Sequence, residues 1–183
     1  MRTHYDILTR VLHWIMATVI IYAMCAGYIM HLVIDSSPHI FNFLSVLNMS
    51  LATVGSALFI IRFIWSFLRP TISGIQPSGI QPSGSLQTKI AHVAHSLLYI
   101  LMFTVFVSGF LMLKTGYDLF WLIPIDNLIS DPEVNAFFFM MHRVSCAMLA
   151  LLVAVHASAA LHHHYKKKNN VLHSMVGPAL KAR

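Results

Sequence analysis

The stretch "MHRVSCAMLALLVAVHASAALHHHY", residues 141–165, decides the fold. It is apolar and long enough to cross a bilayer as a helix, which takes about 20 residues. Histidines nevertheless stand inside it, at positions 142 and 156. Ionisable residues within a membrane span are costly, and they normally face the bundle interior or a cavity. The stretch therefore predicts a transmembrane helix with one functional face.

The rest of the chain has the composition of a membrane protein. Of its 183 residues, 57% are hydrophobic and 10% are charged, whereas soluble domains have about 25% charged residues. Four apolar runs can each span a bilayer, at residues 7–33, 41–68, 90–113 and 135–165. We therefore expect an all-α fold, a transmembrane four-helix bundle that takes up residues 1–183 as a single domain. Residues 70–88, with a tandem copy of SGIQP, are predicted to be a linker.

Charged residues near the ends of these runs predict the topology, because Lys and Arg collect on the cytoplasmic side. Basic residues gather on the side of the two termini and the linker: Arg2, Arg10, Arg69, Lys89, Lys166, Lys167, Lys168, Lys181 and Arg183. The opposite loops are mainly acidic, with Asp35, Asp118, Asp126, Asp131 and Glu133 beside Lys114. We expect a multi-pass protein with both termini cytoplasmic. The chain has no motif that reads a nucleic-acid groove, so we expect no nucleic-acid partner.

The spacing of the histidines indicates a cofactor. His142 and His156 are nearly four helical turns apart, so they share one face and lie about 21 Å apart along the axis. His13 of the first run reaches a depth similar to that of His156. Two histidines that face each other across a bundle can bind a haem iron from both sides. The alternative is that they are hydrogen-bonded polar residues, and for His92 and His95 we favour hydrogen bonding near the interface.

Three segments resemble the bacterial cytochrome b561 family of the inner membrane: "LHWI" at 12–15, "AHVAH" at 91–95 and the stretch at 141–165. That family is in turn similar to the cytochrome b subunits of nickel-iron hydrogenases and formate dehydrogenases. The resemblance implies two b haems in a four-helix bundle in the bacterial inner membrane. It also implies electron transfer between a quinone, such as ubiquinone, and a partner or, in some members, superoxide.

The resemblance also implies a set of haem ligands. His13 and His156 would bind the iron of an inner haem, and His142 would bind that of an outer haem. The second ligand of the outer haem falls on Asn48, and Arg62 supports this register because the family has an arginine at that position. An amide oxygen is a poor ligand for haem iron. One or two haems are therefore expected, with the outer one five-coordinate on His142, bound by the Met49 thioether, or absent.

Other polar residues have candidate roles beside these haems. Arg62 is expected either to pair with inner-haem propionates or to extend its charge to the interface. Arg143 could hold outer propionates or attract superoxide. His163 shares a face with His156, and the resemblance implies a quinone site there, since imidazole exchanges protons near neutral pH. His162 and His164 are weaker candidates.

We predict a membrane b-type cytochrome that carries electrons between haem and the quinone pool, as a quinone-linked oxidoreductase, with superoxide as a candidate donor on the outer side. One alternative is a haem-bearing membrane anchor for a separate dehydrogenase. Another is a histidine-lined transporter of metal ions such as zinc or iron. The transporter would explain histidines inside a bundle, but it would not explain their fourteen-residue spacing or the matching depth of His13.

Overall fold

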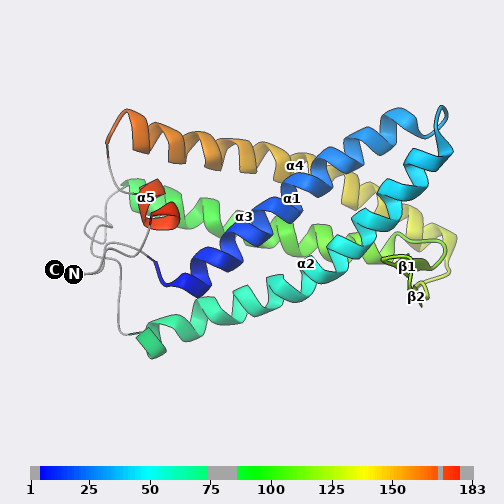
Figure 1. Cartoon of the computed structure of the whole chain (residues 1–183), viewed down its shortest axis with the longest axis horizontal. Helices are drawn as coiled ribbons and strands as arrows, with labels where there is room; N and C mark the ends of the chain where they lie inside the picture. The colour runs from blue at the N-terminus through cyan, green and yellow to red at the C-terminus, as the bar shows by residue number, and fades with distance from the viewer. Residues whose placement is uncertain (1–4, 74–85, 169–170, 178–183) are drawn as a thin grey trace.

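Four long helices make up most of the protein in the computed structural model, which describes residues 5–73, 86–168 and 171–177 (Figure 1). They are α1 (Ile7–Val33), α2 (Pro38–Ser73), α3 (Leu86–Leu111) and α4 (Pro132–Tyr165). Each is long and apolar enough to cross a membrane. The predicted all-α transmembrane bundle is confirmed.

Two of the helices begin at a proline that lies before the apolar run. Proline suits the first turn, where its missing N–H has no partner to lose, and it starts α2 at Pro38 and α4 at Pro132. Asp131 caps α4, because its Oδ1 accepts hydrogen bonds from the backbone N–H groups of Glu133, at 2.9 Å, and Val134, at 3.1 Å. The Asp-Pro pair at 131–132 thus moves the helix start three residues ahead of the expected position.

The predicted linker is helical at both ends. α2 continues to Ser73 and α3 begins at Leu86, so both helices extend into the expected 70–88 segment. The α3 helix ends at Leu111 rather than at residue 113. Residues 74–85, which hold most of the SGIQP repeat, lie outside the described residues.

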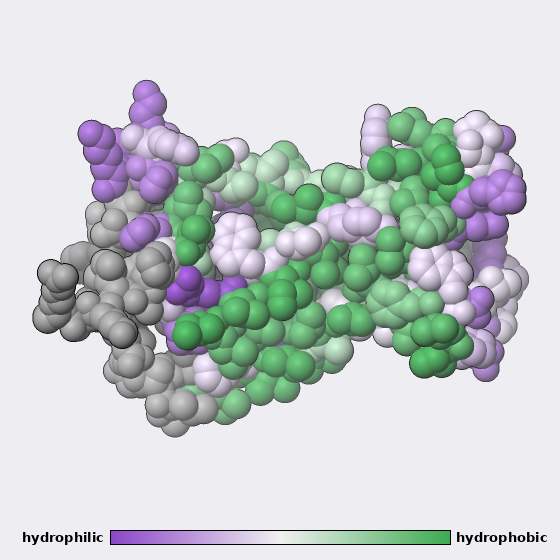
Figure 2. Space-filling model, in the orientation of Figure 1, coloured by the Kyte–Doolittle hydropathy of each residue, from purple (hydrophilic) through white to green (hydrophobic). Residues whose placement is uncertain are grey.

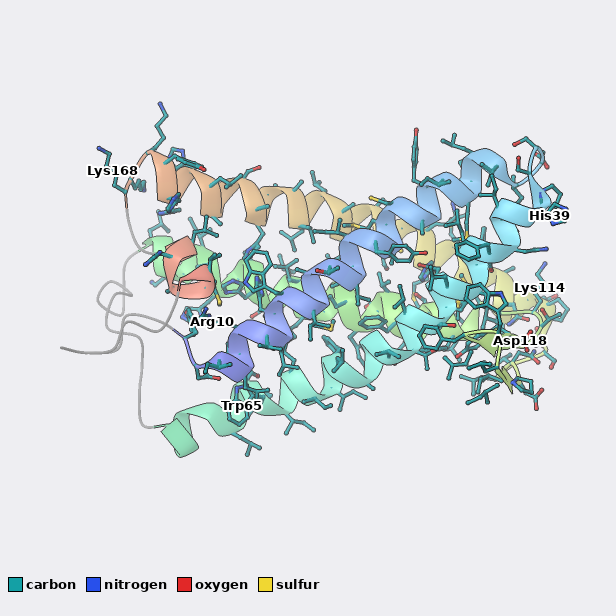
Figure 3. All side chains as sticks on the ribbon, viewed as in Figure 1. Arg10, His39, Trp65, Lys114, Asp118 and Lys168 are labelled. Atoms are coloured by element: carbon teal, nitrogen blue, oxygen red, sulfur yellow. The ribbon has the colours of Figure 1, made fainter. Side chains whose placement is uncertain are left out.

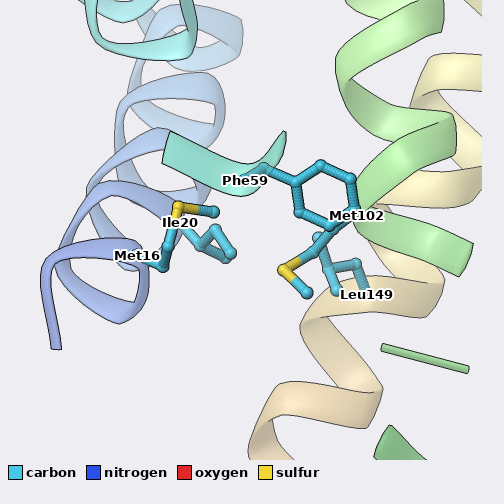
Figure 4. Close-up of a cluster of buried hydrophobic side chains, with 5 residues drawn as sticks. All are labelled: Met16, Ile20, Phe59, Met102 and Leu149. Atoms are coloured by element: carbon cyan, nitrogen blue, oxygen red, sulfur yellow. The ribbon is translucent and has the colours of Figure 1, made fainter. Parts of the chain in front are cut away.

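The helices pair into two hairpins. α1 packs along α2 and α3 packs along α4, while the backbones of different hairpins approach each other at few points. A cluster of buried side chains joins the hairpins in the middle, drawn from all four helices (Figure 4): Met16, Ile20, Phe59, Met102 and Leu149. Polar groups above or below this cluster on the inward helix faces therefore lie between the two hairpins.

The two ends of the bundle are polar, and its middle is apolar. Figure 2 shows hydrophobic residues along the middle of one face, with hydrophilic residues gathered at both ends. We call the end with Arg10 and Lys168 the basic end, and the end with Lys114 and Asp118 the loop end (Figure 3). The start of α1 and the end of α4 both lie toward the basic end (Figure 1). This distribution suits a protein surrounded by lipid between two aqueous layers.

The loop end is closed by a two-stranded hairpin that the apolar pattern did not predict. β1 (Tyr117–Leu119) pairs antiparallel with β2 (Ile123–Ile125). The backbone N–H of Phe120 donates to Ser50 Oγ at 2.7 Å, and the Tyr117 hydroxyl lies 2.7 Å from Thr53 Oγ1. The hairpin is thereby anchored to α2.

A short helix, α5 (Val171–Val176), follows α4 at the basic end. Arg10 and Trp14 of α1 both donate to the carbonyl of Met175, at 3.2 Å and 3.1 Å. Arg10 Nη2 also donates to the carbonyl of Val176 at 3.2 Å. These bonds satisfy carbonyls at the end of α5, where no further helical N–H can reach them, and fix α5 on α1.

Candidate functional site

His13 of α1 and His156 of α4 face each other across the space between the hairpins. Their ring centroids are 6.4 Å apart, and both side chains are half-buried. A bond between an imidazole nitrogen and a metal ion is about 2 Å long, so two imidazoles that hold one ion from opposite sides have centroids about 6 Å apart. The observed separation suits a single metal centre bound from both hairpins.

Helix geometry explains why these histidines point inward. On α1, His13 precedes the buried Met16 by three residues and Ile20 by seven, so all three lie on one face. On α4, His156 follows the buried Leu149 by seven residues. Since Met16, Ile20 and Leu149 form part of the central cluster, both histidines stand next to it on its basic-end side.

His95 of α3 is a third imidazole at this site. Its ring centroid lies 5.3 Å from that of His156, so it is closer to His156 than the ring of His13 is. The residue as a whole is nevertheless exposed. Our sequence interpretation treated His95 as an interfacial polar residue. The signal that could have found it is the one used for His13, namely a histidine at the depth of His156 on another helix.

Arg62 connects three helices at the same level. Its Nη2 donates to His13 Nδ1 at 3.1 Å, and its Nε donates to the Tyr99 hydroxyl at 3.1 Å. The guanidinium carbon also lies 5.9 Å from the centroid of the Tyr99 ring. The side chain is half-buried, and its guanidinium contacts one residue of each hairpin, His13 and Tyr99. We call the set His13, Arg62, His95, Tyr99 and His156 the inner site.

His163 lies further along α4 toward the basic end. It follows His156 by seven residues and is half-buried, whereas the neighbouring His162 is exposed, with the two ring centroids 6.1 Å apart. His163 therefore stands on the helix face of His156, between the inner site and the basic end.

His142 does not join the inner site. It lies at the opposite end of α4, where its Nδ1 is 3.1 Å from the carbonyl of Val105 and 3.2 Å from Ser108 Oγ, both on α3. On α2, the Oδ1 atom of Asn48 is buried and lacks a hydrogen-bond partner among the described residues. Met49 beside it is buried as well. Of the predicted site residues, the structure brings His13, His156 and Arg62 together and leaves His142 apart.

Arg143 lies on the exposed side of α4. Its guanidinium carbon sits 5.7 Å from the centroid of the Phe139 ring, one turn earlier on the same helix. The residue is exposed, whereas its neighbour His142 is half-buried. Arg143 thus faces away from the space between the hairpins.

The donor atoms of the inner site are imidazole nitrogens from three helices, with a guanidinium beside them. Within residues 5–73, 86–168 and 171–177, no group of three or more His, Cys, Asp or Glu side chains converges well enough to hold a metal ion. Two imidazoles that face each other instead suit an iron whose other four ligands come from a porphyrin. The donor set fits haem, and the guanidinium of Arg62 lies beside it, 3.1 Å from His13 Nδ1.

Four helices that can each span a membrane, with a pair of facing histidines between them, are typical of membrane proteins that bind haem and transfer electrons. A family model described as prokaryotic cytochrome b561 matches residues 4–178, and the chain belongs to this family. It is a multi-pass membrane protein, a b-type cytochrome that acts in electron transfer and binds b-type haem. A comparison with curated proteins gives no significant match.

Proposed function

We propose that the protein holds a b haem between His13 and His156 and exchanges electrons between this haem and a quinone at the basic end. The observation that carries this proposal is the 6.4 Å separation of the two rings, which come from different hairpins. Bound haem supplies a one-electron iron centre that alternates between ferric and ferrous states. The protein contributes the ligands, the apolar surroundings and the access route.

The packing of the helices favours His13 over His95 as the partner of His156. A porphyrin plane has to pass between the two ligands of its iron, so it needs open space between the helices that supply them. α3 and α4 pack directly along each other, whereas α1 and α4 belong to different hairpins with few backbone approaches. We therefore favour the pair from α1 and α4 for a porphyrin, and His95 would line the site.

Arg62 is proposed to meet the haem carboxylates. A guanidinium can only donate hydrogen bonds, so His13 Nδ1 accepts from Arg62 and the proton of the neutral ring is on Nε2. An imidazole that binds metal through Nε2 carries its proton on Nδ1 instead. His13 therefore cannot accept from Arg62 through Nδ1 while it binds iron through Nε2. A haem carboxylate would then give the guanidinium an alternative partner.

Charge and proton exchange favour the basic end as the quinone side. The bias of Lys and Arg toward the cytoplasm supports a cytoplasmic basic end, which we expect to lie in a bacterial inner membrane. Quinone reduction takes up protons, and His163 is a half-buried imidazole between the inner site and this end. We assign it to the quinone site, where it would hold the quinone oxygen and deliver a proton.

The test is a pair of neighbouring variants, His163→Gln and His162→Gln, in purified protein reconstituted in liposomes. Haem reduction by a short-chain ubiquinol would be followed by stopped-flow absorbance. We expect about a hundredfold slower reduction in H163Q, the lower end of the range for loss of a positioned acid or base, with unchanged haem content. H162Q should behave like the parent protein. Equal rates in the two variants would contradict the assignment of His163, and a purified chain without haem would contradict the whole proposal.

A further inference from the structure

α4 carries two interior histidines on the same face, and only one has the surroundings that a haem needs. His142, Leu149 and His156 are spaced by seven residues, and Leu149 at the midpoint is 3% exposed in the central cluster. Both histidines therefore point toward the space between the hairpins. His156 meets imidazoles of α1 and α3 there. The partners of His142 differ.

His142 is bonded within its own hairpin. A backbone carbonyl can only accept, so the 3.1 Å contact with Val105 fixes the proton of the ring on Nδ1. Nε2 is then the bare nitrogen, and it lies 3.4 Å from Cys146 Sγ, one turn along the same helix. The ring also packs against Gly109 of α3, where a Cβ atom would lie 3.2 Å from His142 Cε1. This tautomer, with its proton on Nδ1, is also the one that binds a metal through Nε2. Whether a haem binds here is therefore decided by the facing helix.

The other hairpin offers no imidazole at this level. Asn48, Gly55 and Arg62 share a face of α2 through their seven-residue spacing. This face points inward, because a Cβ atom at Gly55 would lie 3.0 Å from Val19 Cγ1 and 3.5 Å from the Phe106 ring. The position opposite the loop-end half of α4 is therefore Asn48, whose buried Oδ1 has no hydrogen-bond partner in the described part of the chain.

The remaining histidines of the first hairpin cannot replace it. His31 and His39 lie at the turn between α1 and α2, and both are exposed. The neighbouring α2 hydroxyls are also occupied, because Ser50 accepts from the Phe120 N–H and Thr53 pairs with the Tyr117 hydroxyl. These bonds anchor the β1–β2 hairpin beside Asn48. Among the described histidines of α1 and α2, His13 of the inner site is therefore the one that lies on the interior side.

We infer that this chain holds one haem, at the inner site, and that Asn48 is the residue that prevents a second haem on His142. The inference rests on the proposed function, since it takes the inner site to bind haem. A carboxamide oxygen is a weak donor to haem iron compared with imidazole, and the axial ligands of b haems come from stronger donors. As a consequence, a donor such as superoxide at the loop end has no haem beside it.

The test counts haem per chain by the pyridine haemochrome method in purified protein, with redox titration of the absorbance. The parent protein and His142→Ala should each contain one haem with one midpoint potential. Asn48→His should gain a second haem and a second potential, while Asn48→Ala should not. The double variant Asn48→His, His142→Ala should return to one haem, because the added haem would use both residues.

Three results would overturn the inference. Two haems in the parent protein, with one lost in His142→Ala, would show that the loop-end site binds haem despite Asn48, through Met49 or through His142 alone. A count of one in Asn48→His would show that Asn48 does not control occupancy. A parent protein without haem would overturn the inference together with the proposed function, which separates that failure from the first two.

Discussion

The two ends of the bundle treat the same helix face of α4 in different ways. At the inner site, His156 faces His13 of the other hairpin, and Arg62 of that hairpin bonds to both His13 and Tyr99. At the loop end, His142 bonds to the carbonyl of Val105 in its own hairpin. The corresponding position on α2 of the other hairpin is Asn48 instead of a histidine. A helical repeat determines where a side chain points, but a cofactor site also needs a suitable residue on the facing helix.

The largest expected effect comes from removing His156, the proposed ligand whose ring contacts both His13 and His95. His156→Ala should abolish haem binding, because His156 is the imidazole of α4 that lies against His13, with ring centroids 6.4 Å apart. His142→Ala is the matched control, since it removes the same side chain from the same helix face. Both would be measured by haem content per chain after purification, with membrane insertion checked by immunoblot. Retention of haem in H156A would remove the basis for the contrast between the two ends.

His95 offers a way to sharpen the assignment of the ligands. If His13 and His156 hold the iron, His13→Ala should lose haem, and His95→Ala should keep it with altered electron paramagnetic resonance g values. The reason is that the His95 ring lies 5.3 Å from that of His156 and affects its orientation. His92→Ala is the control, because His92 is exposed and precedes His95 by one helical turn. Loss of haem in H95A with retention in H13A would reverse the assignment.

The apolar runs predicted the four helices because membrane spans depend on length and hydrophobicity, which are local properties. The fourteen-residue spacing similarly placed His142 and His156 on one face. The contact of His95 with His156 was not predicted, because it depends on how α3 packs beside α4. The depth of His95 along its helix was the available signal, but periodicity within one helix does not report such a contact. The β1–β2 hairpin was missed for a related reason, since it is held by Ser50 and Thr53, distant in sequence.

A smaller effect is expected from the charge of Arg62. Arg62→Gln should lower the midpoint potential of the inner haem by about 60 mV, a tenfold change in a one-electron equilibrium. The physical reason is that a nearby cation stabilises the reduced haem, which carries one positive charge fewer. Arg10→Gln is the matched control, because Arg10 bonds to the carbonyls of α5 instead. Redox titration would measure both, and equal potentials would place the charge of Arg62 away from the haem.

The smallest expected effect concerns the bonds that hold His142 within its hairpin. Ser108 is fully buried and lies 3.2 Å from His142 Nδ1, but the Val105 carbonyl remains when the hydroxyl is removed. Ser108→Ala should therefore cost only about 0.6 kcal/mol of stability, the average for side-chain hydrogen bonds within a membrane bundle. Thr104→Ala is the control, since Thr104 Oγ1 bonds only to the carbonyl of Ile100 on its own helix. Thermal unfolding in detergent would compare the two variants at equal haem content. If S108A lost haem while T104A did not, His142 would be a ligand after all, and the two ends of α4 would be alike.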